Sequence, residues 1–238
     1  MSSMTRRLIL FDLDGTLLIS DGLGRRALDE AFAALYGWET ACEGISFSGM
    51  TDPLIVAEVF AKHGRDAQEA EREEGRVFEH YVGRMRTLLA SRAGAVRALP
   101  GAAALLERLA GEARAFVGVL TGNVEGGARA KLRASGLGDA FYRAGAYGDD
   151  ARDRPGLLPV ALERANSLLE SGTSPWRPEE VVIVGDTPRD VGVARAHGAR
   201  AVAVATGWVS SEELASHRPD ALLDTLECLE SALHAVLA

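Results

Sequence analysis

One short stretch limits the fold more than any other part of this 238-residue chain. The apolar run Leu8-Ile9-Leu10-Phe11 ends at two aspartates, Asp12 and Asp14, and is closed by Gly15. A short, branched apolar run of this kind predicts a strand buried on both faces, as in a parallel sheet. If the chain stays extended, the two carboxylates point to the same side, about 7 Å apart. Their repulsion and desolvation predict either a divalent cation between them or a simple Asp-Gly-Thr turn.

Strands and helices alternate along the second half of the chain. Apolar runs near 115–120, 181–185 and 201–205 are separated by helical patterns, and a weaker run follows at 221–223. This alternation is typical of an α/β fold with a doubly wound parallel sheet. The stretch 140–147 is a further candidate strand, and the Ser- and Pro-rich stretch 171–178 is predicted to be a surface insertion.

The region between residues 20 and 93 has helical periodicity and no convincing strand. One helix is predicted at 27–35, a second from Asp52-Pro53 to Gly64, and a third at 66–91. In the second helix, Asp52 is expected to be the N-cap and Pro53 the first helical residue. We therefore expect a small helical domain, residues 20–93, and a core domain formed by residues 1–19 and 94–238.

Charge and composition exclude several classes of partner. The net charge of −8 without a basic cluster argues against nucleic acid, and no apolar run approaches the roughly 18 residues of a membrane span. A cytoplasmic protein, either a monomer or a homodimer, is expected. Cys42 and Cys228 are predicted to be free thiols, and the scattered histidines form no zinc pattern.

Apolar runs end in polar residues three times, at Asp12–Thr16, Thr121–Asn123 and Gly185–Asp190. In an open parallel sheet, ligands bind beyond the carboxyl ends of the strands, so these residues are expected to share one crevice. Carboxylates beside a Thr-Gly turn suit Mg²⁺ and a phosphoryl group. A hard cation there would explain how Asp12, Asp14 and Asp186 tolerate one another.

Four motifs in order then point to a family. The stretches FDLDGTLL, VLTGN, DRPGLLP and VVIVGDTPRD resemble the motifs of the haloacid-dehalogenase-like (HAD) superfamily. Within it, the chain is similar to phosphoglycolate-phosphatase-like hydrolases with an inserted helical cap. The resemblance covers nearly the whole chain and implies a three-layer α/β/α core. It also implies a Mg²⁺-dependent phosphatase whose partner is a small phosphorylated metabolite, such as phosphoglycolate or a sugar phosphate.

The resemblance also implies roles for the aspartates. Asp12 would be the nucleophile that forms an aspartyl-phosphate, and Asp14 the general acid and base. The carboxylates of Asp12 and Asp186 and the backbone carbonyl of Asp14 would hold Mg²⁺. Asp190 would support the site from behind the metal ligands, or reach the metal through water.

The phosphoryl group would be bound by the second and third motifs. Thr121, the N–H of Gly122 and the backbone N–H groups of Leu13 and Gly15 are implied donors, with Thr16 and Asn123 as helpers. Where the family usually has a lysine, this chain has Arg154, which we favour over Arg152 as the partner of phosphate and nucleophile. Lys131, on the helix after the second motif, is expected to lie on the surface.

Alternatives remain at both domains. Asp14 separates this chain from the dehalogenases and phosphonatases of the family, which lack that aspartate. A phosphomutase of the same superfamily and a non-catalytic phospho-acceptor remain open. In the cap, Thr51 or Asp52 could touch substrate, although an ordinary N-cap role for Asp52 is favoured. Arg25 and Arg26 are expected to be solvated.

Overall fold

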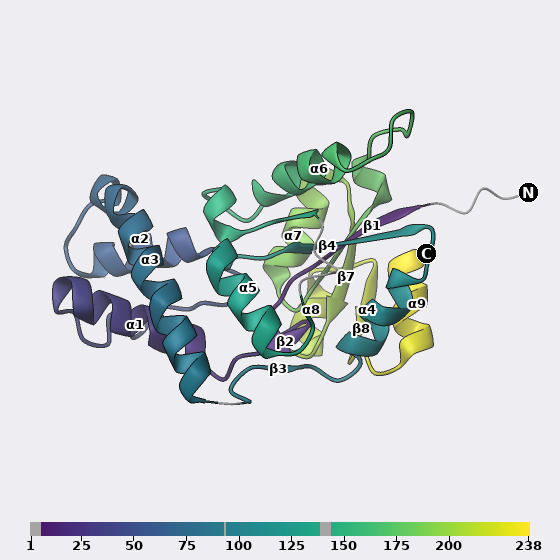
Figure 1. The fold of residues 1–238 in the computed structure, drawn as a ribbon. Helices are drawn as coiled ribbons and strands as arrows, with labels where there is room; N and C mark the ends of the chain where they lie inside the picture. Colours follow the sequence, from purple (N-terminus) through teal and green to yellow (C-terminus); the bar gives the residue numbers. More distant parts are fainter. Residues whose placement is uncertain (1–5, 93, 139–143) are drawn as a thin grey trace, which may run out of the picture.

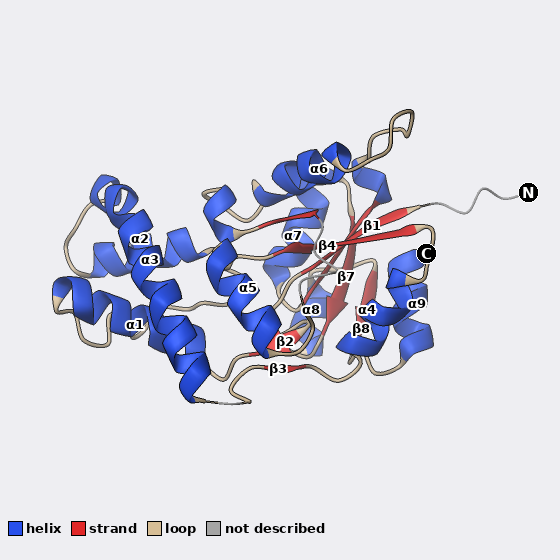
Figure 2. Cartoon of the chain, viewed as in Figure 1, coloured by secondary structure: helices blue, strands red, loops and turns tan. Residues whose placement is uncertain are grey.

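The computed structural model describes residues 6–92, 94–138 and 144–238, with a parallel β-sheet at its centre (Figures 1 and 2). Within these ranges the sheet has six strands in the order β5-β4-β1-β6-β7-β8, and every neighbouring pair is parallel. The strands are β1 (Arg7–Phe11), β4 (Ala115–Leu120), β5 (Ala144–Ala146), β6 (Val181–Gly185), β7 (Arg200–Val204) and β8 (Ala221–Leu223). This order places the carboxyl ends of β1, β4 and β6 side by side, as the sequence predicts.

Helices cover both faces of the sheet (Figure 2). Ile9 and Phe11 share one hydrophobic core with α4, α5 and α9, whereas Leu8 and Leu10 share a second core with α6, α7 and α8. The helices are α4 (Ala102–Ala110), α5 (Glu125–Ala134), α6 (Leu157–Ser167), α7 (Pro188–His197), α8 (Ser211–Ser216) and α9 (Leu229–Leu237). Alternate residues of β1 therefore serve opposite faces, which confirms the predicted doubly wound α/β core.

Three helices form a separate group beside the carboxyl edge of the sheet (Figure 1). They are α1 (Leu23–Tyr36), α2 (Asp52–Lys62) and α3 (Ala67–Ser91), and both α1 and α2 pack against α3. Asp66 caps α3 by accepting a hydrogen bond from the N–H of Glu69 at 2.8 Å. We call this group the cap; its exact boundaries as a domain, 20–93, stay a prediction.

The structure contains a small second sheet that no sequence pattern predicts. Strands β2 (Leu18–Ile19) and β3 (Arg97–Ala98) pair antiparallel. Two residues per strand are too few to show an alternating pattern, so only the pairing of the two connections reveals them. This pair ties together the two chain segments that enter and leave the cap.

The stretch 171–178 is exposed over most of its length but contains one buried side chain. The expectation of a surface insertion at 171–178 was wrong for Trp176, because its ring is buried and packs in the core that contains Leu8. A short 3₁₀ turn, Pro178–Glu180, follows it.

In the candidate strand 140–147, residues 140–143 lie outside the described residues, whereas Ala144–Ala146 form β5. In the described ranges, no helix has the length and apolarity that a membrane span requires.

Candidate active site

A cavity of about 430 Å³ lies where the carboxyl ends of the central strands meet the cap. The core contributes Asp12, Thr121 and Asp186 to its lining, and the cap contributes Phe47 and Met50 among others. The three polar sets at the strand ends therefore meet at one place, as the parallel sheet predicts.

Three carboxylates lie close together at this end of the sheet, and those of Asp12 and Asp186 line the cavity. Asp12, Asp186 and Asp190 each offer an oxygen, and these atoms lie within 4.8 Å of one another. All three side chains are buried. Arg154 reaches the cluster with its Nη2 atom, 2.8 Å from Asp12 and 2.5 Å from Asp190. The predicted preference for Arg154 over Arg152 as the partner of Asp12 agrees with this geometry.

The charges of this cluster do not balance. Burial raises the pKa of Asp12 to about 6, although Arg154 opposes the shift and Asp190 adds to it. Burial and the neighbouring charges of Asp12 and Asp190 also raise the pKa of Asp186 well above its usual value. Three buried carboxylates face one guanidinium, so an additional cation would stabilise their ionised forms. An all-oxygen donor set of this kind suits a hard divalent metal.

Asp190 lies in the cluster itself rather than behind it. Its Oδ1 atom accepts hydrogen bonds from Arg154, and its Oδ2 atom accepts from the hydroxyl of Thr187 at 2.6 Å and from the Thr187 N–H at 3.0 Å. Thr187 caps α7, and this capping geometry fixes the Asp190 carboxylate. The Asp190 carboxylate is therefore positioned to bind a metal ion directly, in addition to the supporting role that the sequence suggested.

Asp14 belongs to a different set of contacts. Its carboxylate accepts hydrogen bonds from Ser20 Oγ at 2.7 Å, Asn123 Nδ2 at 2.9 Å and Lys131 Nζ at 2.6 Å. Burial raises the pKa of Asp14, but Lys131 and the hydrogen bonds outweigh it, so the net shift is downward. The two aspartates of the first motif therefore have different electrostatic surroundings, and such a difference can give two carboxylates separate roles.

The expected surface position of Lys131 was wrong. Its side chain is only 4% exposed, and Nζ also donates to Asn123 Oδ1 at 2.7 Å. The residue lies on α5, which begins at Glu125 just after the second motif. Lys131 is less than two helical turns from that start, so its long side chain reaches back to the site. Helical periodicity shows on which face of α5 Lys131 lies, but it does not show which other element packs against that face.

The turns after β1 and β4 bring backbone groups to the cavity. Gly15 has a φ of 88°, and any side chain there would clash with the Asp186 carboxylate. Thr16 Oγ1 lies 3.2 Å from Asp186 Oδ1, and a backbone hydrogen bond from Leu13 lowers the pKa of Asp12. Thr121 is buried, and its Oγ1 accepts a hydrogen bond from Asn123 Nδ2 at 2.9 Å.

The cap loop docks directly on the second motif. The N–H of Asp52 donates to the carbonyl of Gly122 at 2.7 Å, and a Cβ on Gly122 would clash with the backbone of Met50. The expected N-cap role of Asp52 was wrong: Thr51 is the N-cap of α2, and Asp52 is its first residue. The Asp52 carboxylate instead accepts a hydrogen bond from the N–H of Val124 in the core at 2.8 Å. Thr51 is buried and donates to the carbonyl of Arg152.

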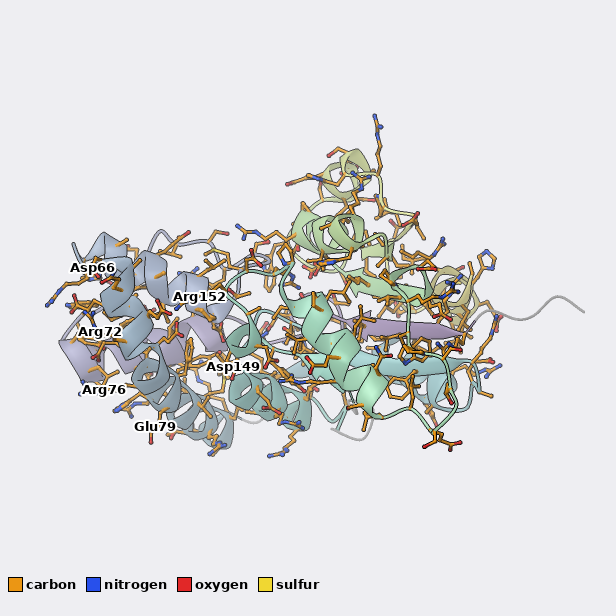
Figure 3. The ribbon with its side chains drawn as sticks, turned by 90° about the horizontal axis from the view of Figure 1, so that it is seen from above. Asp66, Arg72, Arg76, Glu79, Asp149 and Arg152 are labelled. Carbon is orange, nitrogen blue, oxygen red and sulfur yellow. The ribbon has the colours of Figure 1, made fainter. Side chains whose placement is uncertain are left out.

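Two of the arginines considered above, Arg152 and Arg26, form ion pairs away from the cavity, whereas Arg25 lines it. Arg152 pairs with Glu71 and Glu74 of α3, at the border between core and cap that Figure 3 shows. Arg26 is exposed and pairs with Glu30 at 3.0 Å, as expected of a solvated residue. The same expectation was wrong for Arg25, which is half-buried and lines the cavity.

Several further residues at the site were not found from the sequence. Thr206 Oγ1 donates to the carbonyl of Gly15 at 2.6 Å, and a side chain on Gly207 would clash with Asp186. These two residues follow β7, a fourth strand that ends on the same edge of the sheet. Their position directly after an apolar run is therefore a sequence signal that could have identified them. Ser20 and Tyr81 had no such signal, because they come from the segment that enters the cap and from the middle of α3.

Known proteins resemble this chain in sequence. The model of the haloacid dehalogenase-like hydrolase family matches residues 6–198. A phosphoglycolate phosphatase from Rhodospirillum rubrum is 31% identical over 93% of this chain and 88% of its own length. A phosphoglycolate phosphatase from Synechococcus elongatus is 34% identical over 55% of this chain and 57% of its own length.

Solved structures share the fold at lower identity. CbbY from Rhodobacter sphaeroides, in complex with phosphate, superposes with a TM-score of 0.70 at 24% identity, over 94% of this chain and 96% of that one. A predicted phosphoglycolate phosphatase from Haemophilus somnus gives a TM-score of 0.68 at 18% identity, over 98% and 99% of the two chains. Together the matches confirm the predicted family and, through the relatives named as phosphatases, the predicted class of enzyme. This chain belongs to the haloacid dehalogenase-like hydrolase family.

Proposed function

We propose that this chain is a magnesium-dependent phosphatase that hydrolyses small phosphate monoesters, of the phosphoglycolate or sugar phosphate type, through an aspartyl-phosphate. The observation that carries the proposal is the separation of two aspartates within one cavity. Asp12 lies among carboxylates beside Arg154, whereas Asp14 lies among hydrogen-bond donors that include Lys131. The relatives named as phosphoglycolate phosphatases support this substrate class.

Asp12 would act as the nucleophile on phosphorus. One carboxylate oxygen forms the new bond to phosphorus while the bond to the ester oxygen breaks. Arg154, already 2.8 Å from Asp12 Oδ2, would bind an oxygen of the transferred group and hold the nucleophile in place. Thr121 and the N–H of Gly122 would bind the remaining phosphoryl oxygens, where negative charge develops.

Asp14 would carry the proton in both steps. In the first step the leaving ester oxygen takes a proton from Asp14, and in the second the Asp14 carboxylate takes a proton from the attacking water. The contacts with Lys131, Asn123 and Ser20 favour the ionised carboxylate and so the second of these states. The proton taken from water in the second step returns Asp14 to the protonated form that the first step of the next turnover needs.

Asp12 and Asp186, together with the backbone carbonyl of Asp14, would hold Mg²⁺, and the carboxylate of Asp190 is close enough to the cluster to join them. Bound there, the ion would neutralise the carboxylates and the phosphoryl oxygens. The unbalanced charge of the three buried aspartates is the structural observation that fits such an ion.

Two measurements test the proposal. Hydrolysis of a panel of phosphate esters should require Mg²⁺ and stop with EDTA, and Asp12→Asn should abolish turnover while circular dichroism and the melting temperature stay close to wild type. Turnover without any divalent ion, or an active Asp12→Asn variant, would contradict the mechanism. A product that keeps its phosphate at a new position would indicate the alternative, a phosphomutase. Formation of a stable phospho-protein without turnover would indicate the phospho-acceptor.

The cytoplasmic location, the absence of a nucleic-acid or membrane partner, and the choice between monomer and homodimer stay predictions of the sequence.

A further inference from the structure

Three cationic side chains line the cavity among the described residues, and two of them have carboxylate partners. Lys131 contacts Asp14, and Arg154 contacts Asp12 and Asp190. Arg25 is the third, and it forms no ion pair within the described part of the chain. A guanidinium that lines a cavity without a carboxylate partner can form a charge-assisted pair with a negative group that enters the cavity.

The guanidinium of Arg25 is held in a fixed position. Its Nη1 atom donates to the carbonyl of Cys42, and its Nη2 atom donates to the carbonyl of Ile45 at 2.6 Å. Its carbon atom Cζ lies 4.2 Å from the centre of the Phe47 ring, which also lines the cavity. These contacts use two of the five N–H groups of the arginine, so three remain for a ligand. An arginine fixed in this way binds an anion with little loss of side-chain freedom.

The cap provides a second donor, the hydroxyl of Tyr81. This side chain is 2% exposed and lines the cavity, and its hydroxyl has no hydrogen-bond partner among the residues that the structure describes. Burial raises the pKa of Tyr81 well above its usual value, so the hydroxyl keeps its proton. Buried hydroxyl groups normally have a partner, which makes this one available to a ligand.

Gly24 leaves space around this hydroxyl. A Cβ atom at Gly24 would lie 3.6 Å from Tyr81 Oη and 3.5 Å from Lys131 Nζ. The space beside Gly24 therefore lies between Lys131, which contacts Asp14, and the hydroxyl of Tyr81 in the cap. A leaving alcohol that takes its proton from Asp14 would extend toward this part of the cavity.

From these contacts we infer that Arg25, assisted by Tyr81, binds an anionic group on the alcohol part of the substrate. The inference rests on the proposed phosphatase function and narrows its substrate class to phosphate esters whose leaving alcohol carries a carboxylate or a second phosphate. Arg25 would thus determine specificity, while the core residues perform the transfer itself.

The test compares three two-carbon esters that differ in the leaving alcohol: 2-phosphoglycolate, ethane-1,2-diol bisphosphate and ethyl phosphate. Wild-type enzyme should prefer at least one of the two anionic esters over ethyl phosphate. Arg25→Gln should lower kcat/KM for that ester roughly 10- to 100-fold, mainly through KM, and its loss on ethyl phosphate should be at least tenfold smaller. Tyr81→Phe should lower the same kcat/KM roughly 2- to 10-fold. Which anionic ester is preferred identifies the anion as carboxylate or phosphate.

Arg26→Gln is the matched control, because Arg26 is the next residue on α1 and pairs with Glu30 at the surface. It should keep wild-type kinetics on all three esters. Arg25→Lys, which retains the charge without the planar fork, should restore part of the preference. If Arg25→Gln proves unstable in a thermal melt, Tyr81→Phe still tests the inference, because it removes only an unpartnered hydroxyl.

A binding measurement distinguishes a failure of this inference from a failure of the proposed function. Calorimetric titration of the Asp12→Asn variant with each ester, with and without Arg25→Gln, measures recognition without turnover. The inference is overturned if wild-type enzyme shows no preference for an anionic alcohol, or if Arg25→Gln weakens binding of ethyl phosphate as much as that of the anionic esters. Absence of turnover by wild-type enzyme would instead contradict the proposed function, while the titration would still decide the role of Arg25.

Discussion

Arg154 is the residue whose contacts link the buried carboxylates of the site to one another and to the cap. Its guanidinium contacts Asp12 and Asp190 in a buried cluster, and Nη1 also donates to the carbonyl of Gly49 in the cap at 3.3 Å. An arginine in this position neutralises the cluster in part and links it to the cap loop. The lysine that the family usually places in this motif could supply the charge but not all of these contacts.

Arg154→Ala should therefore affect both stability and activity. Removal of one partner from a buried ion pair leaves the carboxylates uncompensated, at a cost of about 3–5 kcal/mol in the free energy of unfolding. We expect kcat/KM to fall roughly 100-fold or more, with Arg154→Lys intermediate. Denaturant unfolding and initial rates measure the two effects.

Arg152→Ala is the matched control, since its ion pairs with Glu71 and Glu74 involve side chains that are partly exposed to solvent. It should cost no more than about 1 kcal/mol and keep kcat/KM within about threefold. Equal losses in the two alanine variants would contradict the placement of the third motif.

The two lysines of the chain provide a second comparison at the scale of single residues. Lys131→Met removes the ammonium group from Asp14 and Asn123, so we expect a loss of about 1–3 kcal/mol in stability and at least a tenfold lower kcat. Lys62→Met, which removes an exposed residue that donates to the carbonyls of Ala41 and Glu43, should change stability by about 1 kcal/mol at most. A Lys131→Met variant with wild-type kinetics would show that Asp14 does not need this contact.

At the scale of elements, the beginning of α2 is attached to the turn that follows β4. The carboxylate of Asp52 accepts from Val124, and its own N–H donates to Gly122, so one residue of the cap satisfies backbone groups of the core. Burial raises the pKa of Asp52 to about 6, although the hydrogen bond from Val124 and the charge of Lys131 oppose the shift. This attachment is therefore sensitive to pH.

The sign of the effect follows from the direction of the shift. Because the folded pKa lies above the ordinary value of 3.8, the protonated side chain stabilises the fold below about pH 4, and this contribution is lost as the pH rises through about 6. Asp52→Asn imitates the neutral form. Relative to wild type, the variant should gain up to about 3 kcal/mol in the free energy of unfolding between pH 4 and pH 7. Urea unfolding at several pH values measures this, and a constant difference would contradict it.

At the scale of the whole molecule, the cap and the core have separate tasks. The core supplies the carboxylates and the turns that follow β1 and β4, whereas the cap supplies Arg25, Tyr81 and the loop that covers Gly122. The pairing of Ile19 with Arg97 brings the two connecting segments together at the base of the cap. A short Gly-Ser link can therefore replace residues 20–93 with little change in the path of the chain.

The deletion should spare the hydrolysis of p-nitrophenyl phosphate and remove the discrimination among natural esters. A nitrophenolate is a good leaving group and needs neither the cap nor a proton from Asp14, although the loss of Ser20 also removes one hydrogen bond to that carboxylate. The core should be less stable than the full chain, so circular dichroism must first show that the deleted form is folded. Unchanged selectivity among esters would show that the cap does not contribute to substrate specificity.

Local patterns in the chain were sufficient to predict the parallel sheet, the helical cap and the positions of the main acidic residues. Strand patterns and strand ends are local properties, and the parallel arrangement then brings Asp12, Thr121 and Asp186 together wherever those strands are neighbours. Even the choice of Arg154 followed from the spacing of its motif.

In contrast, which helical side chains reach the site depends on how the helices pack. Lys131, Arg25 and Tyr81 lie on helices whose periodicity marks a face but not the surface that faces it. Packing of α3 against α1 and α5 turns these three side chains toward the cavity, and the docking of the cap loop converts Asp52 from an apparent N-cap into a contact with the core. The physical reason is that such contacts depend on how two elements far apart in the sequence are oriented, and no local pattern in either element contains that orientation.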